Sequence, residues 1–178
     1  MIIDLDPGQG VPFPAVCRLA LRVKEILNQL SLNGYPKTSG SKGLHVLVPL
    51  DSRNDYKSVR RFTEVIARLA VHSMGDLATI ERGMEKRKGK IYIDYLQNGF
   101  GKTIVSPYCL RPKPGAPVST PLNWSEVSSN IRPPASNIRS LFRRLKAKGD
   151  PFQALLTEKQ SLQHALLQLE NLLSDGSP

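Results

Sequence analysis

IIDLDPG, the stretch at residues 2–8, is apolar except for two aspartates that stand two positions apart. In an extended segment successive side chains point to opposite faces, so Asp4 and Asp6 share one face while Ile3 and Leu5 share the other. Two carboxylates held this close raise each other's pKa unless a cation lies between them. The pattern therefore predicts a strand that buries one face and offers a candidate divalent-metal site on the other. The alternative is that the two aspartates only mark the end of a strand before a Pro-Gly turn.

The composition favours a basic, single-domain protein with a polyanionic partner. The 178 residues are enough for one domain or a large part of one, and the formal net charge is +10. No apolar run is long enough to span a membrane, so nucleic acid or nucleotide is the favoured partner. Cys17 and Cys109 are isolated, which argues against a zinc site and against a disulfide framework. Because the N-terminus lacks the pattern of a signal peptide, we expect a cytoplasmic protein with no membrane partner.

The spacing of apolar residues predicts an alternation of strands and helices. Apolar residues recur at helical spacing over residues 13–30 and 59–70, and residues 44–50 alternate as a strand. The runs 90–97 and 102–108 are rich in β-forming residues and are joined by NGFG, a strong turn signal, so we expect them to form an antiparallel pair. With the first strand, this order predicts an α+β fold with a mixed or antiparallel sheet flanked by helices.

The last third of the sequence is expected to be helical. Residues 111–124 are too rich in proline for regular structure and predict an ordered loop or an edge segment. Beyond Trp124 the pattern is helical and contains a basic cluster, which either tracks a nucleic-acid backbone or forms the solvated face of a helix. The cluster consists of Arg139, Arg143, Arg144, Lys146 and Lys148. An apolar stripe follows, formed by Phe152, Leu155, Leu156, Leu162, Leu166, Leu169 and Leu173.

A third acid, Asp94, interrupts a strand pattern in the run KIYIDYLQ. Alternation places Asp94 on the polar face, away from Ile91 and Ile93. Because a buried carboxylate without a partner is costly, this acid needs either a nearby lysine or a metal ion. An Asp–Lys pair is the structural alternative, but Asp4 and Asp6 give the metal more weight.

The turn TSGSKGLH at residues 38–45 brings a hydroxyl, a lysine and a histidine close together in the sequence. Backbone N–H groups of such a turn, with Ser39 and Lys42, suit a phosphate group, and His45 can donate a hydrogen bond to it. The turn is not a P-loop, because the G-x-x-x-x-G-K-[ST] spacing and the helix after it are missing. The alternatives are an ordinary surface turn and a histidine whose hydrogen bonds are satisfied in the core.

Two further cations, Arg111 and Lys113, lie in the proline-rich stretch, where the backbone has little conformational freedom. They are placed to meet a triphosphate or the backbone of a template strand. For an isolated R-x-K pair, solvated surface side chains are the alternative interpretation.

Taken together, four blocks closely resemble the polymerase domain of bacterial DNA ligase D, which belongs to the archaeo-eukaryotic primase superfamily. The blocks are IIDLDP, KTSGSKGLHVLVPL, RKGKIYIDYLQNGFGKTIVSPYCLRPKPGAPVSTPLNW and KGDPF, in this order. The resemblance implies an RRM-like primase-polymerase catalytic core over residues 1–156. Residues 157–178 are then a C-terminal amphipathic helix and tail.

The resemblance also implies roles for individual residues. The catalytic, metal-binding acids of the family fall on Asp4, Asp6 and Asp94. The nucleotide-binding positions fall on Ser39, Lys42, His45, Gln97, Arg111 and Lys113. The last of these positions is commonly arginine in the family, and lysine keeps the charge but loses the bidentate fork.

The implied activity is addition of nucleotides, often ribonucleotides, to primer 3′-ends during end-joining repair in bacteria, with two Mg²⁺ or Mn²⁺ ions. The implied partners are DNA ends, NTP or dNTP, and ligase and Ku-type end-joining proteins, in the nucleoid region of the cytoplasm. Family members carry a segment before the D-x-D strand that this sequence lacks, so we expect an N-terminally truncated form. The alternatives are a catalytically inactive remnant that binds nucleic acid or nucleotide, and a primase that starts strands unaided.

Overall fold

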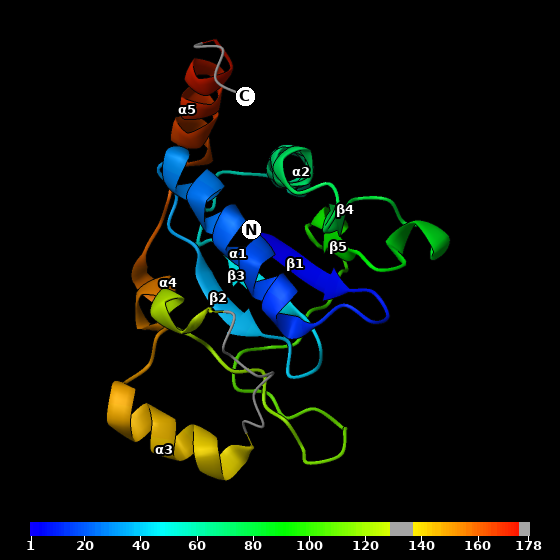
Figure 1. The fold of residues 1–178 in the computed structure, drawn as a ribbon. Coiled ribbons are helices and arrows are strands. Elements are labelled where there is room, and N and C mark those ends of the chain that lie inside the picture. Colours follow the sequence, from blue (N-terminus) through cyan, green and yellow to red (C-terminus); the bar gives the residue numbers. More distant parts are fainter. Residues whose placement is uncertain (129–136, 175–178) are drawn as a thin grey trace.

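One mixed sheet organises the molecule, whose computed structural model describes residues 1–128 and 137–174. The strands are β1 (Ile2–Pro7), β2 (Tyr35–Thr38), β3 (Leu44–Leu47), β4 (Ala78–Thr79) and β5 (Ile91–Asp94). Their order in the sheet is β2-β3-β1-β5-β4 (Figure 1). The β4–β5 pair is parallel, and the other neighbours are antiparallel. The α+β class with a mixed sheet, predicted from the sequence, is confirmed.

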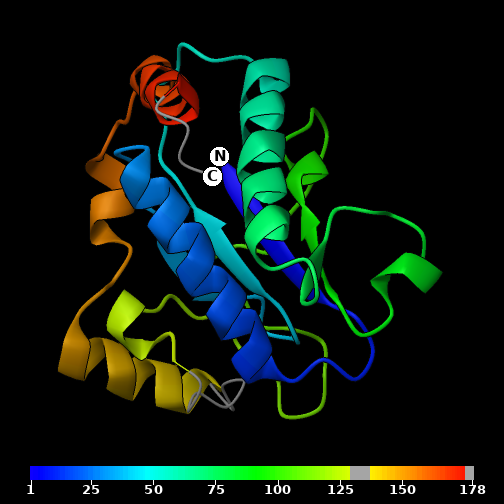
Figure 2. The ribbon, with the colours of Figure 1, turned by 45° about the horizontal axis from the view of Figure 1, so that its top comes forward.

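The central strand, β1, separates an apolar face of the sheet from a polar one. Ile3 and Leu5 are fully buried in the hydrophobic core. The helices α1 (Phe13–Gln29) and α2 (Tyr56–Ser73) lie side by side over this face (Figure 2). Alternation along the strand turns Asp4 and Asp6 to the opposite face, as the sequence predicts. The helices thus supply the core and leave the polar face of β1 available for chemistry.

The predicted antiparallel pair of residues 90–97 and 102–108 is wrong. Strand β5 ends at Asp94, residues 95–97 form a 3₁₀ turn, and residues 102–108 are not in a strand. The Asp94 carboxylate accepts a hydrogen bond from the backbone N–H of Leu96 at 3.0 Å, which caps this turn and diverts the chain. Strand β1 already occupies one edge of β5, and β4 occupies the start of the other. The segment after NGFG therefore has no free edge of β5 with which to pair.

The C-terminal part contains three helices, and the predicted apolar stripe is divided between separate helices. They are α3 (Ile138–Lys148), α4 (Gln153–Thr157) and α5 (Leu162–Ser174). The stripe is interrupted because the side chains of Glu158 and Gln160 bond to Asn33, at the start of the segment that leads into β2. Within the stripe Leu156 is exposed, whereas Leu162 joins the hydrophobic core. The side chain of Leu173 lies outside the described residues.

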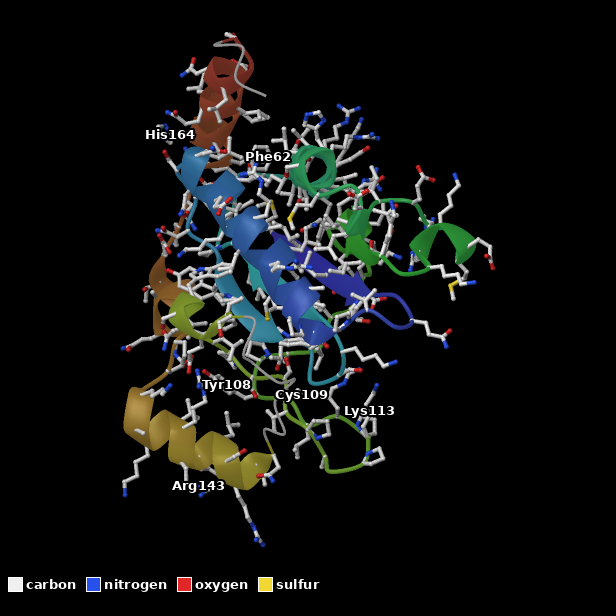
Figure 3. The ribbon with its side chains drawn as sticks, in the orientation of Figure 1. Phe62, Tyr108, Cys109, Lys113, Arg143 and His164 are labelled. Carbon is white, nitrogen blue, oxygen red and sulfur yellow. The ribbon has the colours of Figure 1, made fainter. Side chains whose placement is uncertain are left out.

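The predicted basic cluster lies on α3, and its members divide into paired and solvent-facing residues. Arg144 and Lys148 both bind the carboxylate of Glu126, with 2.7 Å between Lys148 Nζ and Glu126 Oε1. Hydrogen bonds from Arg144 lower the pKa of Glu126 to about 2. Arg143 points away from the body of the protein (Figure 3). Along the described stretches, none of the helices combines the length and apolarity needed to cross a bilayer.

Replacing Glu126 by glutamine is expected to loosen α3. The variant leaves the partly buried guanidinium of Arg144 without its carboxylate, which costs about 2 kcal/mol of unfolding free energy. Chemical denaturation and amide exchange over residues 138–148 measure the effect. Glu25→Gln is the matched control, because the exposed Arg22–Glu25 pair contributes at most about 0.5 kcal/mol. Equal losses in the two variants would contradict the anchoring role of Glu126.

Candidate active site

Four polar side chains form one row across the sheet. Lys37 of β2 is opposite His45 of β3, His45 is opposite Asp4 of β1, and Asp4 is opposite Asp94 of β5. Residues directly opposite each other in antiparallel strands turn their side chains to the same face. Asp6 is two positions beyond Asp4 on that same face. The register therefore brings together acids that lie far apart in the sequence.

Asp4 is the most strongly perturbed of these acids. Its pKa is raised to about 7, chiefly by burial and then by the nearby carboxylates of Asp6 and Asp94. The cation of Lys37 and a hydrogen bond from Gln97 act in the opposite direction. A carboxylate in this position holds a proton near neutral pH or requires a cation beside it.

The Asp94 carboxylate accepts hydrogen bonds from residues close to it in the sequence. Its Oδ1 accepts hydrogen bonds from the backbone N–H of Leu96 at 3.0 Å and from the hydroxyl of Tyr92 at 3.4 Å. Within residues 1–128 and 137–174, no three His, Cys, Asp or Glu side chains form a group that could hold a metal ion. The alternative Asp–Lys pair is not formed either, since Asp94 makes no ion pair among the described residues. The nearest lysine in sequence, Lys90, instead donates to the carbonyl oxygen of Gly75.

The serine turn joins β2 to β3 beside this row. The hydroxyl oxygen of Ser39 accepts hydrogen bonds from the backbone N–H groups of Ser41 at 3.2 Å and Gly43 at 3.0 Å. Both bonds use the oxygen as acceptor, so the hydroxyl proton remains available to a ligand. Lys113 Nζ donates to the hydroxyl oxygen of Ser41 at 2.6 Å, which ties the proline-rich loop to the turn.

His45 is not a satisfied core histidine. Its Nε2 lies 3.4 Å from Asp4 Oδ1, but its buried Nδ1 has no partner among the described residues, and neither has the buried Nε of Arg111. The pKa of His45 is lowered to about 3, chiefly by burial and then by the positive charges of Lys37 and Arg111. The imidazole is therefore neutral at physiological pH. Buried polar atoms without partners call for an explanation, and a polar ligand in the adjoining cleft provides one.

These side chains line one open cleft of about 290 Å³. Its lining residues are Asp4, Asp6, Ser39, Ser41, Lys42, Gly43, His45, Gln97, Thr103, Ile104, Val105 and Arg111. Asp94 and Lys113 are not lining residues, but each has a neighbour that is. Asp94 lies opposite Asp4 in the sheet, and Lys113 donates a hydrogen bond to Ser41. Figure 3 shows Cys109 and Lys113 on the loop that runs below the sheet. All nine candidate residues therefore belong to one neighbourhood.

Gly40→Ala is expected to disturb this cleft through the position of Arg111. The φ angle of Gly40 is +67°, and an added Cβ would lie 2.6 Å from Cγ of Arg111. The unfavourable φ costs about 1–3 kcal/mol of stability, and the contact displaces Arg111. Gly115→Ala is the matched control, with φ +80° and nothing within 4 Å of the added Cβ. Thermal unfolding should show the larger loss in Gly40→Ala, because its added Cβ also lies 2.9 Å from the backbone N of Ser119. Ligand affinity at the cleft should fall only in Gly40→Ala, and equal affinities would refute the prediction.

A protein-family model matches most of the chain. The family described as "LigD, primase-polymerase domain" matches residues 1–152. The chain belongs to this family. The resemblance inferred from the sequence blocks is confirmed.

Curated LigD proteins from several bacteria are similar in sequence. The bifunctional non-homologous end joining protein LigD of Bacillus subtilis is 37% identical over 153 residues, which are 85% of this chain and 25% of that protein. The multifunctional non-homologous end joining protein LigD of Pseudomonas aeruginosa is 33% identical over 167 residues, 93% of this chain and 20% of that protein. The chain thus spans a quarter or less of these LigD relatives, which are named for DNA end joining.

A solved LigD structure has the same fold. The polymerase domain from Mycobacterium tuberculosis ligase D in complex with DNA superposes with a TM-score of 0.83 and 30% sequence identity. The match covers 90% of this chain and 55% of that chain. The likeness therefore extends over nearly all of the LigD-type fold described above.

Two residues of this LigD family member were not predicted from the sequence as part of the site. Lys37 is 0% exposed, donates from Nζ to the hydroxyl of Ser119 at 2.7 Å and forms one end of the polar row. Only the register of β2 against His45 reveals it, because a lysine before a turn is expected in solvent. The guanidinium carbon of Arg87 lies 3.5 Å from the centre of the Tyr92 ring. The block that includes RKGKIY contains Arg87, but no local pattern distinguishes it from its basic neighbours.

Proposed function

We propose that this chain is a nucleotidyltransferase that adds ribonucleotides or deoxynucleotides to primer 3′-ends by two-metal-ion catalysis. The observation that carries the proposal is the cross-strand register, which turns Asp4, Asp6 and Asp94 to one face beside the Ser39–His45 turn. The raised pKa of Asp4 supports it, because a buried carboxylate with two further acids on its face is stabilised by a cation.

In this proposal the serine turn and the loop behind it bind the triphosphate of the incoming nucleotide. The free proton of Ser39 and a neutral His45 donate hydrogen bonds to phosphate oxygens. Lys42, Arg111 and Lys113 neutralise the phosphate charge. The buried Nε of Arg111, which lacks a partner in the described residues, then finds one in the ligand. Gln97, which already donates to Asp4, lies where it can also approach the sugar.

The acids are suited to divalent cations. Their donor set consists of carboxylate oxygens, which are the ligands that Mg²⁺ and Mn²⁺ prefer. Two such ions would activate the primer 3′-hydroxyl and neutralise charge on the reacting phosphate and the leaving pyrophosphate. Asp4, Asp6 and Asp94 would hold them, and this requires the Asp94 carboxylate to turn from the N–H of Leu96 toward Asp4. No protein side chain has to serve as a general base.

In this proposal the primer terminus occupies a second hollow. It has a volume of about 400 Å³ and is lined by residues of the β1 end and of the loop before β5. Asp6 lines both this hollow and the nucleotide cleft. A primer terminus in the second hollow therefore meets the nucleotide at the acid cluster. Arg87 and Lys88 supply positive charge for the strand that enters there.

The biological setting of the proposal follows from the names of the relatives. They are end-joining proteins, so we propose DNA ends as substrates, with a ligase sealing the product and Ku-type proteins presenting the ends. The reaction then takes place on the nucleoid in the bacterial cytoplasm.

Primer extension tests the proposed activity. The purified chain, a labelled primer–template, NTP and Mn²⁺ should give products longer than the primer by one or more nucleotides. Addition of EDTA should abolish extension, and excess Mn²⁺ should restore it. If the folded protein binds DNA but extends no primer with either metal, a nucleic-acid-binding remnant is the correct interpretation. Dinucleotide formation on an unprimed template would instead identify a primase.

A further inference from the structure

An exposed pair of aromatic rings lies outside the candidate active site. Phe100, in the NGFG turn, is 89% exposed, and Tyr56, the first residue of α2, is 60% exposed. Their ring centres are 6.1 Å apart at 79°, an edge-to-face arrangement. Two large rings that pack on each other in water leave much of their apolar surface without a partner.

The turn that carries Phe100 is firmly anchored. The side chain of Asn98 is buried and accepts a hydrogen bond from Ile2 N at 2.8 Å. Its amide nitrogen donates to the carbonyl oxygen of Ile2 at 2.7 Å and to that of Tyr95 at 3.1 Å. Asn98 thus bonds to the first residue of β1, the strand that carries Asp4. The start of the turn is therefore fixed two residues before Phe100, which lowers the entropic cost of ordering the turn around a ligand.

The turn that carries Phe100 is continuous in the chain with two residues of the cleft. Gln97 and Thr103, at the two ends of the NGFG turn, both line the cleft, and Phe100 lies between them in the chain. A strand that leaves the cleft past Gln97 and Thr103 meets the Phe100 ring within a few residues of the turn. The pair is thus placed at the exit of the site and not within it.

Exposed cations outnumber acids around the rings, where the acid next in sequence is Asp55, the residue before Tyr56. Lys57 and Lys102 are exposed beside Tyr56 and Phe100, and Arg60 is one helical turn from Tyr56 on the same face of α2. None of these three cations takes part in an ion pair within the described parts of the chain. Aromatic rings among free cations are typical of surfaces that bind single-stranded nucleic acid by base stacking and phosphate attraction. Protein interfaces, in contrast, are depleted of lysine.

We propose that Phe100 and Tyr56 form a stacking platform for an unpaired nucleic-acid strand at the exit of the cleft. The proposal rests on the proposed function and deepens it, because it assigns a contact surface for an unpaired strand outside the residues that line the cleft. A base of the overhang stacks on the Phe100 ring, Tyr56 supports that ring from its edge, and Lys57, Arg60 and Lys102 attract the adjoining phosphates.

Binding measurements without nucleotide or metal test the platform independently of catalysis. The probes are a fluorophore-labelled single-stranded oligonucleotide and a blunt duplex, titrated with the full chain over a range of salt concentrations. Phe100→Ala should weaken single-strand binding about tenfold, and Phe100→Trp should restore it, because stacking needs a ring and not a particular one. The slope of log affinity against log salt should stay unchanged in both variants, since no phosphate contact is lost.

Lys57→Gln is the matched control for the charge. It should reduce the magnitude of the salt slope by about 0.7, the value for one phosphate contact on a single strand. Unchanged single-strand affinity in Phe100→Ala would overturn the platform, and so would an equal loss on the blunt duplex or full restoration by Phe100→Leu. If these binding results hold but no primer is extended, the platform stands as a binding site and only the proposed catalysis fails.

Discussion

Asp94→Ala is expected to reduce nucleotide addition about 1000-fold or more, with little effect on DNA binding. Asp94 lies directly opposite Asp4 across the β1–β5 ladder, so its removal opens one side of the acid cluster. Metal ions stabilise the transition state of phosphoryl transfer by several kcal/mol. A loss of about 4 kcal/mol corresponds to about three powers of ten in rate. Single-turnover primer extension with Mn²⁺ measures the effect.

The control for this substitution is Asp76→Asn, which removes an exposed acid that lies away from the cleft. It should leave extension within about twofold of the wild-type rate, since substitutions on the surface have small effects. Asp94→Ala also removes the carboxylate that caps the turn at Leu96, so its fold is checked by thermal unfolding. A folded Asp94→Ala protein that still extends primers would disprove the role of this acid.

Much of the fold could be predicted because apolar periodicity is a local property of sequence. The two long helices follow from apolar spacing near 13–30 and 59–70, and β1 follows from the alternation of Ile3 and Leu5 with two acids. The strands β2 and β4 carry no such signal, since the sequence of β2 is YPKT, which includes a proline, and β4 has only two residues. Their existence depends on the edges that β3 and β5 offer to them.

The parts that could not be predicted depend on contacts between distant segments. The pattern of residues 102–108 is that of a strand, but β5 had no suitable edge for it after the turn capped by Asp94. The buried position of Lys37 depends on its partner Ser119 in the proline-rich loop, 82 positions away. The convergence of Asp4 and Asp94 likewise depends on strand register. Local patterns predict the residue types of the candidate site, and register decides which of them meet.

The contribution of Asp4 to the stability of the metal-free protein should fall as pH rises from about 4 to about 7. The pKa of Asp4 rises from its ordinary value of 3.8 to about 7 in the folded state, chiefly because of burial and then because of Asp6 and Asp94. Below the unfolded pKa the carboxyl is protonated in both states. Between the two pKa values the folded protein keeps a proton that the unfolded chain releases, so the free energy of unfolding decreases with pH. The stabilisation is lost once pH passes through the folded value.

Comparison with Asp4→Asn isolates this effect, because the amide does not titrate and other carboxylates contribute equally to both proteins. The wild-type free energy of unfolding, less that of Asp4→Asn, should fall by a few kcal/mol, about 1.4 for each pH unit of the shift. Mn²⁺ should reverse the trend, since it binds the ionised carboxylate and stabilises the wild type more at pH 8 than at pH 5. Urea denaturation at several pH values, with and without Mn²⁺, measures both changes. A difference that is flat or rises with pH would show that Asp4 is ionised in the folded protein without any cation, and the acid cluster would then require no metal to form.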